Sequence, residues 1–223
     1  MKLQDELHHL TALIERETAP RVLGVINQFI RDIRRRQVTQ RSLTVGDTIA
    51  NFALPDQYGR LTNLYDYLNT GPVVLNFYRG GWCPYCNLEL KALHHAWPEL
   101  EYYGARLLTL TPESPDNIAQ TVRKNALDFP VLHDANSEVA RQFGVAITLS
   151  EYMKAFYQSL GLNLSLHNAD VLVRLPLPAL YVINTDYRIR YAFVNEDYRQ
   201  RAELDEVVSE LRNIQHLPVR SYG

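Results

Sequence analysis

Residues 73–86 read VVLNFYRGGWCPYC, and the pattern of this stretch indicates how the centre of the chain folds. Its first six residues are almost all apolar, a pattern typical of a strand that is buried on both faces. Gly80 and Gly81 end the strand in a turn. Pro84 fits a first helical turn, where its missing amide hydrogen is not needed. The stretch therefore predicts a central strand, a tight turn that carries Cys83, and a helix that begins near Pro84.

From Leu43 onward, short runs rich in β-formers alternate with stretches whose apolar residues recur at helical spacing. We expect further strands over residues 105–111, 129–132, 180–184 and 189–194, and helices over 116–126, 137–143 and 203–214. The last two strands are separated by four residues and form an antiparallel hairpin. Alternation of this kind is the signature of an α/β domain. We assign this domain to residues 43–223.

Residues 1–42 precede the domain as a helical extension and linker. Apolar side chains recur at helical spacing on both sides of Pro20, which breaks the segment into two helices. Water exposure of such an apolar stripe is costly, so the domain or a second copy of the chain must cover it. We expect a homodimer in which these helices contribute.

Residues 148–174 interrupt the alternation with many aromatic residues and leucines. A connection of this length with so many apolar side chains should contain helix of its own and pack on the domain. The insertion is either a packed surface element or a lid over a site.

The composition is that of an ordinary globular protein, with 46% hydrophobic and 22% charged residues and a net charge of −2. This balance argues against disorder and against a nucleic-acid partner. No apolar stretch is long enough to span a membrane, and the first ten residues do not resemble a secretory signal. We therefore expect a cytoplasmic protein with no membrane partner.

The chain has two cysteines, and they lie three positions apart as Cys83-Pro84-Tyr85-Cys86. A thiol at a helix start faces unpaired amide hydrogens and the positive end of the helix dipole, which favour its thiolate form. Cys86 lies one turn further on, where it can attack an oxidised Cys83. Cys83 is the candidate attacking thiol and Cys86 the candidate resolving thiol.

Metal binding and simple burial account less well for the cysteine pair. A structural zinc site needs about four ligands, and only His94 and His95 lie nearby, so we expect no metal and no cofactor. Free cysteines are often simply buried, but packing gives no reason to place a turn and a helix start at a thiol.

The sequence resembles the alkyl hydroperoxide reductase and thiol-specific antioxidant family, the peroxiredoxins. Residues 45–56 (VGDTIANFALPD) and 59–64 (GRLTNL) are similar to the opening of that family, and residues 73–86 resemble a peroxiredoxin-like branch. The latter stretch is equally similar to thioredoxin-type disulfide oxidoreductases. The resemblance implies a thioredoxin-like α/β fold, a mixed sheet flanked by helices, and thiol redox chemistry. In either family Gly81, Trp82, Pro84 and Tyr85 would shape the site around the thiols.

The chain departs from both families at specific positions. Gly80 and Asn76 stand where peroxiredoxins place a threonine and a proline, and Pro178 stands near their usual arginine. Arg79 or Arg174 is a candidate to replace that arginine. Pro178 is also similar to the thioredoxin proline that faces the two cysteines through a cis peptide bond. Asn76 in turn replaces a buried aspartate of thioredoxins.

The leading hypothesis is a peroxiredoxin-like peroxidase. Cys83 would reduce a peroxide, Cys86 would close an intramolecular disulfide, and a thioredoxin- or glutaredoxin-type donor would reduce that disulfide. The first alternative is a thioredoxin-like oxidoreductase whose substrate is a protein disulfide. A redox sensor or scaffold without enzymatic activity is the second.

Overall fold

The computed structural model describes residues 2–215. Its α-helices are α1 (Leu3–Glu17), α2 (Pro20–Arg35), α3 (Leu64–Leu68), α4 (Pro84–Tyr102), α5 (Pro115–Asn125), α6 (Glu138–Gln142), α7 (Glu151–Ser159), α8 (Leu164–Asn168) and α9 (Leu204–Gln215). Its strands are β1 (Ala53–Pro55), β2 (Leu61–Asn63), β3 (Val73–Phe77), β4 (Arg106–Thr111), β5 (Val131–His133), β6 (Ala146–Thr148), β7 (Arg174–Pro176), β8 (Ala179–Ile183) and β9 (Ile189–Val194). Two short 3-10 helices span Val38–Arg41 and Ala135–Ser137.

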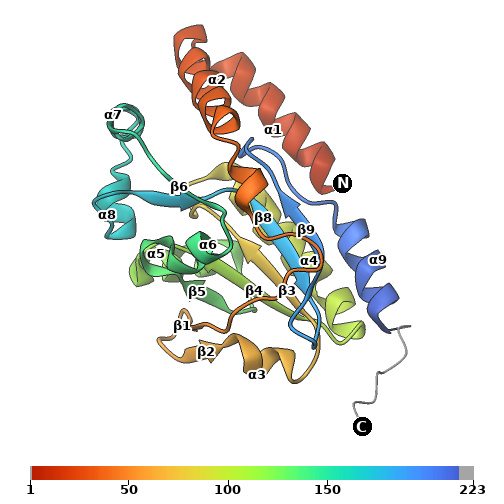
Figure 1. The fold of residues 1–223 in the computed structure, drawn as a ribbon. Helices are drawn as coiled ribbons and strands as arrows, with labels where there is room; N and C mark the ends of the chain where they lie inside the picture. The colour runs from red at the N-terminus through yellow and green to blue at the C-terminus, as the bar shows by residue number, and fades with distance from the viewer. Residues whose placement is uncertain (1, 216–223) are drawn as a thin grey trace.

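A five-stranded mixed sheet forms the centre of the molecule, in the order β5-β4-β3-β8-β9. Strand β3 is the middle strand and is buried along its whole length, as its apolar sequence predicts. It pairs in parallel with β4 and antiparallel with β8. Strands β8 and β9 form the expected hairpin. This is the thioredoxin-like α/β fold that the sequence predicts (Figure 1).

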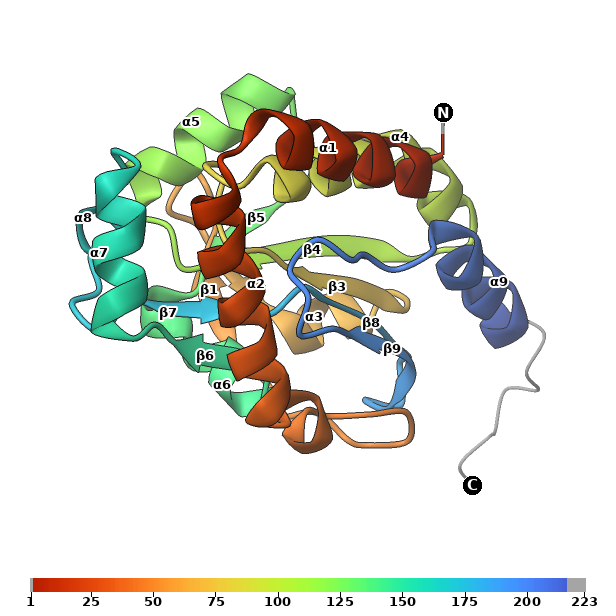
Figure 2. The same cartoon turned by 90° about the horizontal axis from the view of Figure 1, so that it is seen from above.

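Helices cover both faces of the sheet (Figures 1 and 2). One face packs against α4, α5 and α9 through a core that contains both cysteines. The other face packs against α3 and α6 through a second core. Because side chains alternate along a strand, Val74 and Asn76 of β3 lie on the α4 side, and Leu75 lies on the other. The carboxyl end of β3 therefore leads directly to the amino end of α4.

The two N-terminal helices pack on the rest of the same chain. The break between them falls before Pro20, as predicted. The apolar side of α1 lies on the α4 core, with Leu7 only 2% exposed (Figure 2). Helix α2 buries Phe29 and Ile33 in a third core. The apolar stripe is thus partly covered within the chain, and a homodimer contact through these helices stays a prediction.

The segment 148–174 contains helix of its own, as expected. Helices α7 and α8 lie within it, and the strands that flank it, β6 and β7, pair antiparallel. Its buried residues Met153 and Leu164 belong to the same third core as α2, and Trp82 packs against that core. The insertion therefore joins the N-terminal helices to the cysteine turn. Among residues 2–215, every helix is too short or too polar to traverse a lipid bilayer.

Candidate active site

A tight glycine turn carries the candidate thiols from β3 to α4. Gly80 has φ +149°, and a Cβ atom on it would lie 2.3 Å from Trp82 Nε1. A Cβ atom on Gly81 would lie 2.0 Å from Thr121 Oγ1, so this position is closed to any larger residue. The amide of Cys83 donates to the carbonyl of Gly80 at 3.1 Å. The two glycines thus allow the chain to turn beneath α5 without a clash.

Cys83 is the N-cap residue of α4, and Pro84 is the first residue of the helix, as predicted. The side chain of Cys83 is only 1% exposed. A hydrogen bond from the Cys86 thiol, with the positive charges of Arg79 and Arg201, lowers the pKa of Cys83 to about 5, although burial acts in the opposite direction. Cys83 is therefore a thiolate at neutral pH, and its charge is held in a site almost free of water.

Cys86 is fully buried on the first turn of α4 and is the proton-bearing partner. Burial, together with the neighbouring Cys83, raises the pKa of Cys86 well above its ordinary value. The two cysteines are in the reduced form and are not joined in a disulfide. Arg201, from the segment between β9 and α9, donates from Nη2 to Cys86 Sγ at 3.2 Å and from Nε to Glu89 at 2.6 Å. The two sulfur atoms therefore differ sharply in acidity, in the direction that the sequence predicts.

Arg79 lies in an aromatic cage on the outer side of the thiols. Its guanidinium carbon lies 4.8 Å from the ring centre of Trp82 and 4.5 Å from that of Tyr198. Its Nη2 donates to the hydroxyl of Tyr157, on α7, at 2.6 Å. Cation–π contacts and this hydrogen bond hold the buried cation where it faces Cys83. One helix of the insertion thus covers the site.

The other residues singled out in the sequence lie as follows. The Tyr85 hydroxyl lies 3.2 Å from Thr11 Oγ1 of α1, and the Tyr85 ring centre lies 5.7 Å from that of Tyr198. Arg174 pairs with Asp170 at 3.3 Å, whereas Arg79 and Arg201 are the cations that act on Cys83. Pro178 is buried in the bend immediately before β8.

The expectation of a cis bond before Pro178 is wrong. No peptide bond within residues 2–215 is cis. The chain here runs from one strand into the next, since Pro176 pairs with Ala146 in β6 and Ala179 already pairs with Phe77 in β3. The trans isomer is the more stable form of an X-Pro bond.

Residues 45–192, about two thirds of the chain, match the AhpC/TSA family. The chain belongs to this family. It is 32% identical over 103 residues to peroxiredoxin Bcp of Escherichia coli, an alignment that covers 46% of this chain and 65% of that protein. It is also 31% identical over 105 residues to the thiol-disulfide oxidoreductase ResA of Geobacillus thermodenitrificans, covering 47% of this chain and 59% of the relative. The chain thus spans less than two thirds of either protein.

The same family appears among solved structures. Peroxidoxin BcpB from Mycobacterium tuberculosis superposes with a TM-score of 0.61 at 27% identity, over 77% of this chain and 98% of that one. A point mutant of Xylella fastidiosa PrxQ has the same fold, with a TM-score of 0.62 at 19% identity over 78% and 98%.

This AhpC/TSA family member completes its site with residues that the sequence did not single out. Arg201 and Tyr198 follow β9, Glu89 lies further along α4, and Tyr157 lies in the insertion. Arg201, Tyr198 and Tyr157 reach the thiols or Arg79 only through the tertiary fold, whereas Glu89 lies one helical turn beyond Cys86 on α4. The aromatic residues of the insertion, Tyr157 among them, indicate packing or a lid over a site, but the sequence assigns Tyr157 no role.

A buried carboxyl group supports the back of the turn. Glu113 is 1% exposed and accepts hydrogen bonds from the Gly81 amide and from Thr121 Oγ1, the latter at 3.2 Å. Burial raises the pKa of Glu113 to about 7. His167 Nδ1, from α8, lies 3.5 Å from its other oxygen. Glu113 therefore ties the turn at Gly81 to α5 through Thr121.

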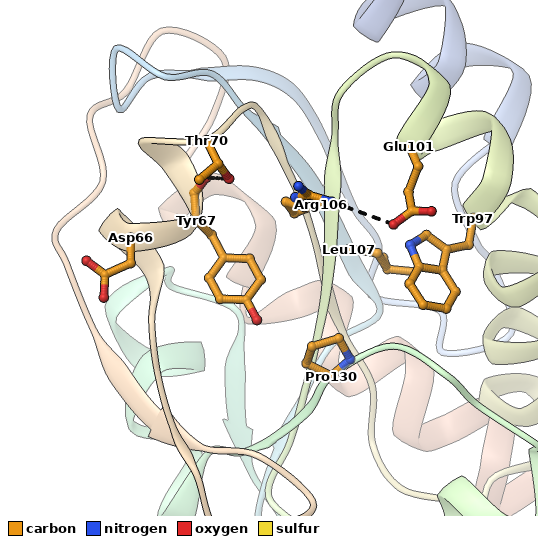
Figure 3. A pocket seen from close by; sticks show the side chains of 8 residues that line it. All are labelled: Asp66, Tyr67, Thr70, Trp97, Glu101, Arg106, Leu107 and Pro130. Carbon is orange, nitrogen blue, oxygen red and sulfur yellow. Dashed lines mark hydrogen bonds and ion pairs between the residues drawn. The ribbon is translucent and has the colours of Figure 1, made fainter.

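A separate pocket of this family member lies away from the thiols. It is lined by Asp66, Tyr67, Thr70, Trp97, Glu101, Arg106, Leu107 and Pro130 (Figure 3). It lies between α3, the carboxyl end of α4 and the start of β4, and Arg106 pairs with Glu101 across it at 3.7 Å. Neither cysteine borders this pocket, so the redox chemistry belongs to the turn.

Proposed function

We propose that this chain is a thiol peroxidase of the peroxiredoxin type. The Cys83 thiolate attacks one oxygen of a hydroperoxide, a sulfur–oxygen bond forms, and the O–O bond breaks. Cys83 becomes a sulfenic acid, and the departing alkoxide or hydroxide takes up a proton to leave as an alcohol or water. The observation that carries this proposal is the buried Cys83 thiolate between Arg79 and Arg201. These two cations also suit the negative charge that develops on the departing oxygen.

Cys86 completes the cycle as the resolving residue. Its sulfur displaces the hydroxyl group of the Cys83 sulfenic acid, a disulfide forms, and the proton of the Cys86 thiol leaves with that hydroxide as water. The hydrogen bond between the two cysteines supports this step because it places the sulfurs side by side. A thioredoxin- or glutaredoxin-type dithiol then reduces the disulfide and becomes a disulfide itself.

Burial favours a peroxide over a protein disulfide as the oxidising substrate. Cys83 is 1% exposed, and Tyr157 lies over the neighbouring Arg79. A hydroperoxide group of two oxygens needs only a small opening to reach the sulfur. A protein disulfide needs a sulfur that is exposed at the surface, so the buried thiolate suits a peroxide better. The Cys83–Cys86 disulfide must in turn become exposed before a protein dithiol reduces it. The similarity to the oxidoreductase ResA keeps disulfide exchange as the second candidate.

Stopped-flow kinetics tests the proposal. The reduced protein is mixed with hydrogen peroxide at neutral pH, and a sulfenic acid is trapped on the Cys86→Ser variant. We expect a second-order rate constant at least about a hundredfold above that of a free thiolate. Cys83→Ser should abolish the reaction, and Cys86→Ser should retain the first oxidation. A rate equal to that of a free thiolate, together with rapid reduction of insulin disulfides, would favour the oxidoreductase function instead.

A further inference from the structure

Arg79 is a buried cation without a carboxylate partner. It is 3% exposed, and within residues 2–215 its guanidinium forms no ion pair with an aspartate or a glutamate. Arg201, by contrast, pairs with the Glu89 carboxylate at 2.6 Å. Cys83 is the ionised group that faces Arg79, since Cys86 keeps its proton. The thiolate of Cys83 is therefore the anion that balances the charge of Arg79.

Formation of the disulfide removes this anion. In a disulfide with Cys86, the Cys83 sulfur carries no charge. Arg201 keeps Glu89 as its partner, but Arg79 is left uncompensated in a site almost free of water. A buried charge that loses its partner is strongly unfavourable. The disulfide form therefore favours an arrangement in which the guanidinium of Arg79 reaches water.

Helix α7 lies at the periphery of the molecule and is tied to this cation through Tyr157 (Figures 1 and 2). The Tyr157 hydroxyl accepts from Arg79 Nη2 at 2.6 Å, and its ring centre lies 5.5 Å from that of Trp82. Of the nine residues 151–159, only Met153 is buried. A helix this short is not stable by itself, so α7 depends on its few contacts with the rest of the chain.

We propose that α7 is a lid that the negative charge of Cys83 holds closed. While Cys83 is a thiolate, Arg79 stays buried and holds Tyr157. When the disulfide replaces the thiolate, Arg79 moves toward water, its contact with Tyr157 breaks and α7 opens. Helix α4 stays folded, because both sulfurs lie on its first turn.

The opening would expose the disulfide to a reducing dithiol, and this use of the lid rests on the proposed function. In that cycle the lasting neutral state is the disulfide, because Cys86 already lies beside the sulfenic acid of Cys83. The coupling between the charge of Cys83 and the position of α7 is independent of any peroxide.

Hydrogen exchange of the full-length protein, followed by mass spectrometry, tests the lid. Reduced protein is compared with protein oxidised by diamide, whose azo bond takes up two electrons and two protons as the disulfide forms. We expect the amides of residues 151–159 to exchange at least about tenfold faster in the disulfide form, and those of α4 to stay protected. Equal exchange of residues 151–159 in the two forms overturns the proposal. Faster exchange of α4 with α7 unchanged also overturns it.

Two variants, kept under reductant, separate the charge from the disulfide bond. Cys83→Ser is neutral and cannot form the disulfide, so residues 151–159 should exchange rapidly in it without any oxidant. Cys86→Ser is the matched control, because it also lacks the disulfide but keeps the thiolate. In this control α7 should be as protected as in the reduced unaltered protein. Protection of α7 in Cys83→Ser overturns the proposal, since the bond and not the charge would then control the lid.

A third variant tests the role of the cation. Arg79→Gln keeps a donor for the Tyr157 hydroxyl but has no charge that needs a partner. Exchange of α7 in this variant should be the same before and after oxidation by diamide, and a remaining difference contradicts the role of Arg79. None of these measurements uses a peroxide, so the peroxidase assay can fail without affecting them.

Discussion

Replacing Cys86 by alanine or by serine should separate its two contributions. The leading cause of the low pKa of Cys83 is the hydrogen bond from Cys86. Serine keeps a donor at this position, and alanine removes it. Neither variant can resolve a sulfenic acid, so a difference between them in the first oxidation reports on the hydrogen bond alone.

The size of the effect follows from the buried charge. A hydrogen bond to a charged group contributes about 1.5–3 kcal/mol, which corresponds to about one to two pKa units. In the alanine variant the pKa of Cys83 should therefore rise from about 5 to about 6–7. At about pH 6 the thiolate fraction falls about two- to tenfold, whereas at about pH 8 it changes by no more than about a tenth.

The assay is the pH dependence of sulfenic acid formation in a single turnover with hydrogen peroxide, with thiolate absorbance as an independent measure. The alanine variant should lose rate on the acidic side and match the serine variant above neutrality. Identical profiles for the two variants, or a lower pKa in the alanine variant, would refute the reasoning.

Two further predictions concern the turn and its support. Gly81→Ala forces a Cβ atom against Thr121 Oγ1, at 2.0 Å in the unaltered structure, and should lower the free energy of unfolding in urea by about 1–3 kcal/mol. In the matched control Gly24→Ala in α2, the added Cβ meets no atom within 4 Å, so the free energy of unfolding should rise by about 0.5–1 kcal/mol. Equal effects of the two substitutions would contradict the packing argument. Because the folded-state pKa of Glu113 lies near 7, above its unfolded value, the folded protein binds more protons between about pH 4.5 and 7, and its stability falls as pH rises through that window. In the Glu113→Gln variant, the loss of unfolding free energy across this pH window should be smaller by about 1–3 kcal/mol. An unchanged pH dependence would show that other groups cause the loss.

The sequence predicted the parts of the site that depend on local structure. The apolar run of β3, the glycine turn and Pro84 together place Cys83 at a helix start, because each acts through its own backbone preferences. Apolar periodicity likewise located both N-terminal helices. It left open which surface covers them, because the same stripe fits the chain itself or another copy.

The parts that the sequence did not reveal are long-range contacts. Arg201 lies 112 positions from Glu89 and 115 from Cys86, and neither spacing carries a signal. The peroxiredoxin pattern predicts an arginine near Pro178, whereas the second cation, Arg201, comes from the segment after β9. The same physical need, a cation beside a buried thiolate, is thus met from a different element.

The burial of both cysteines also bears on how a peroxidase of this kind would survive its own substrate. A sulfenic acid on Cys83 has two fates, closure by Cys86 or attack by a second peroxide that yields the irreversible sulfinic acid. Closure draws on a sulfur already in place, whereas the second peroxide must again enter a covered site. In the proposed peroxidase, an enclosure that restricts entry of a second peroxide would bias each turnover toward the reversible product. Protection against self-inactivation would then come from the packing of α4 and α7 rather than from an additional residue.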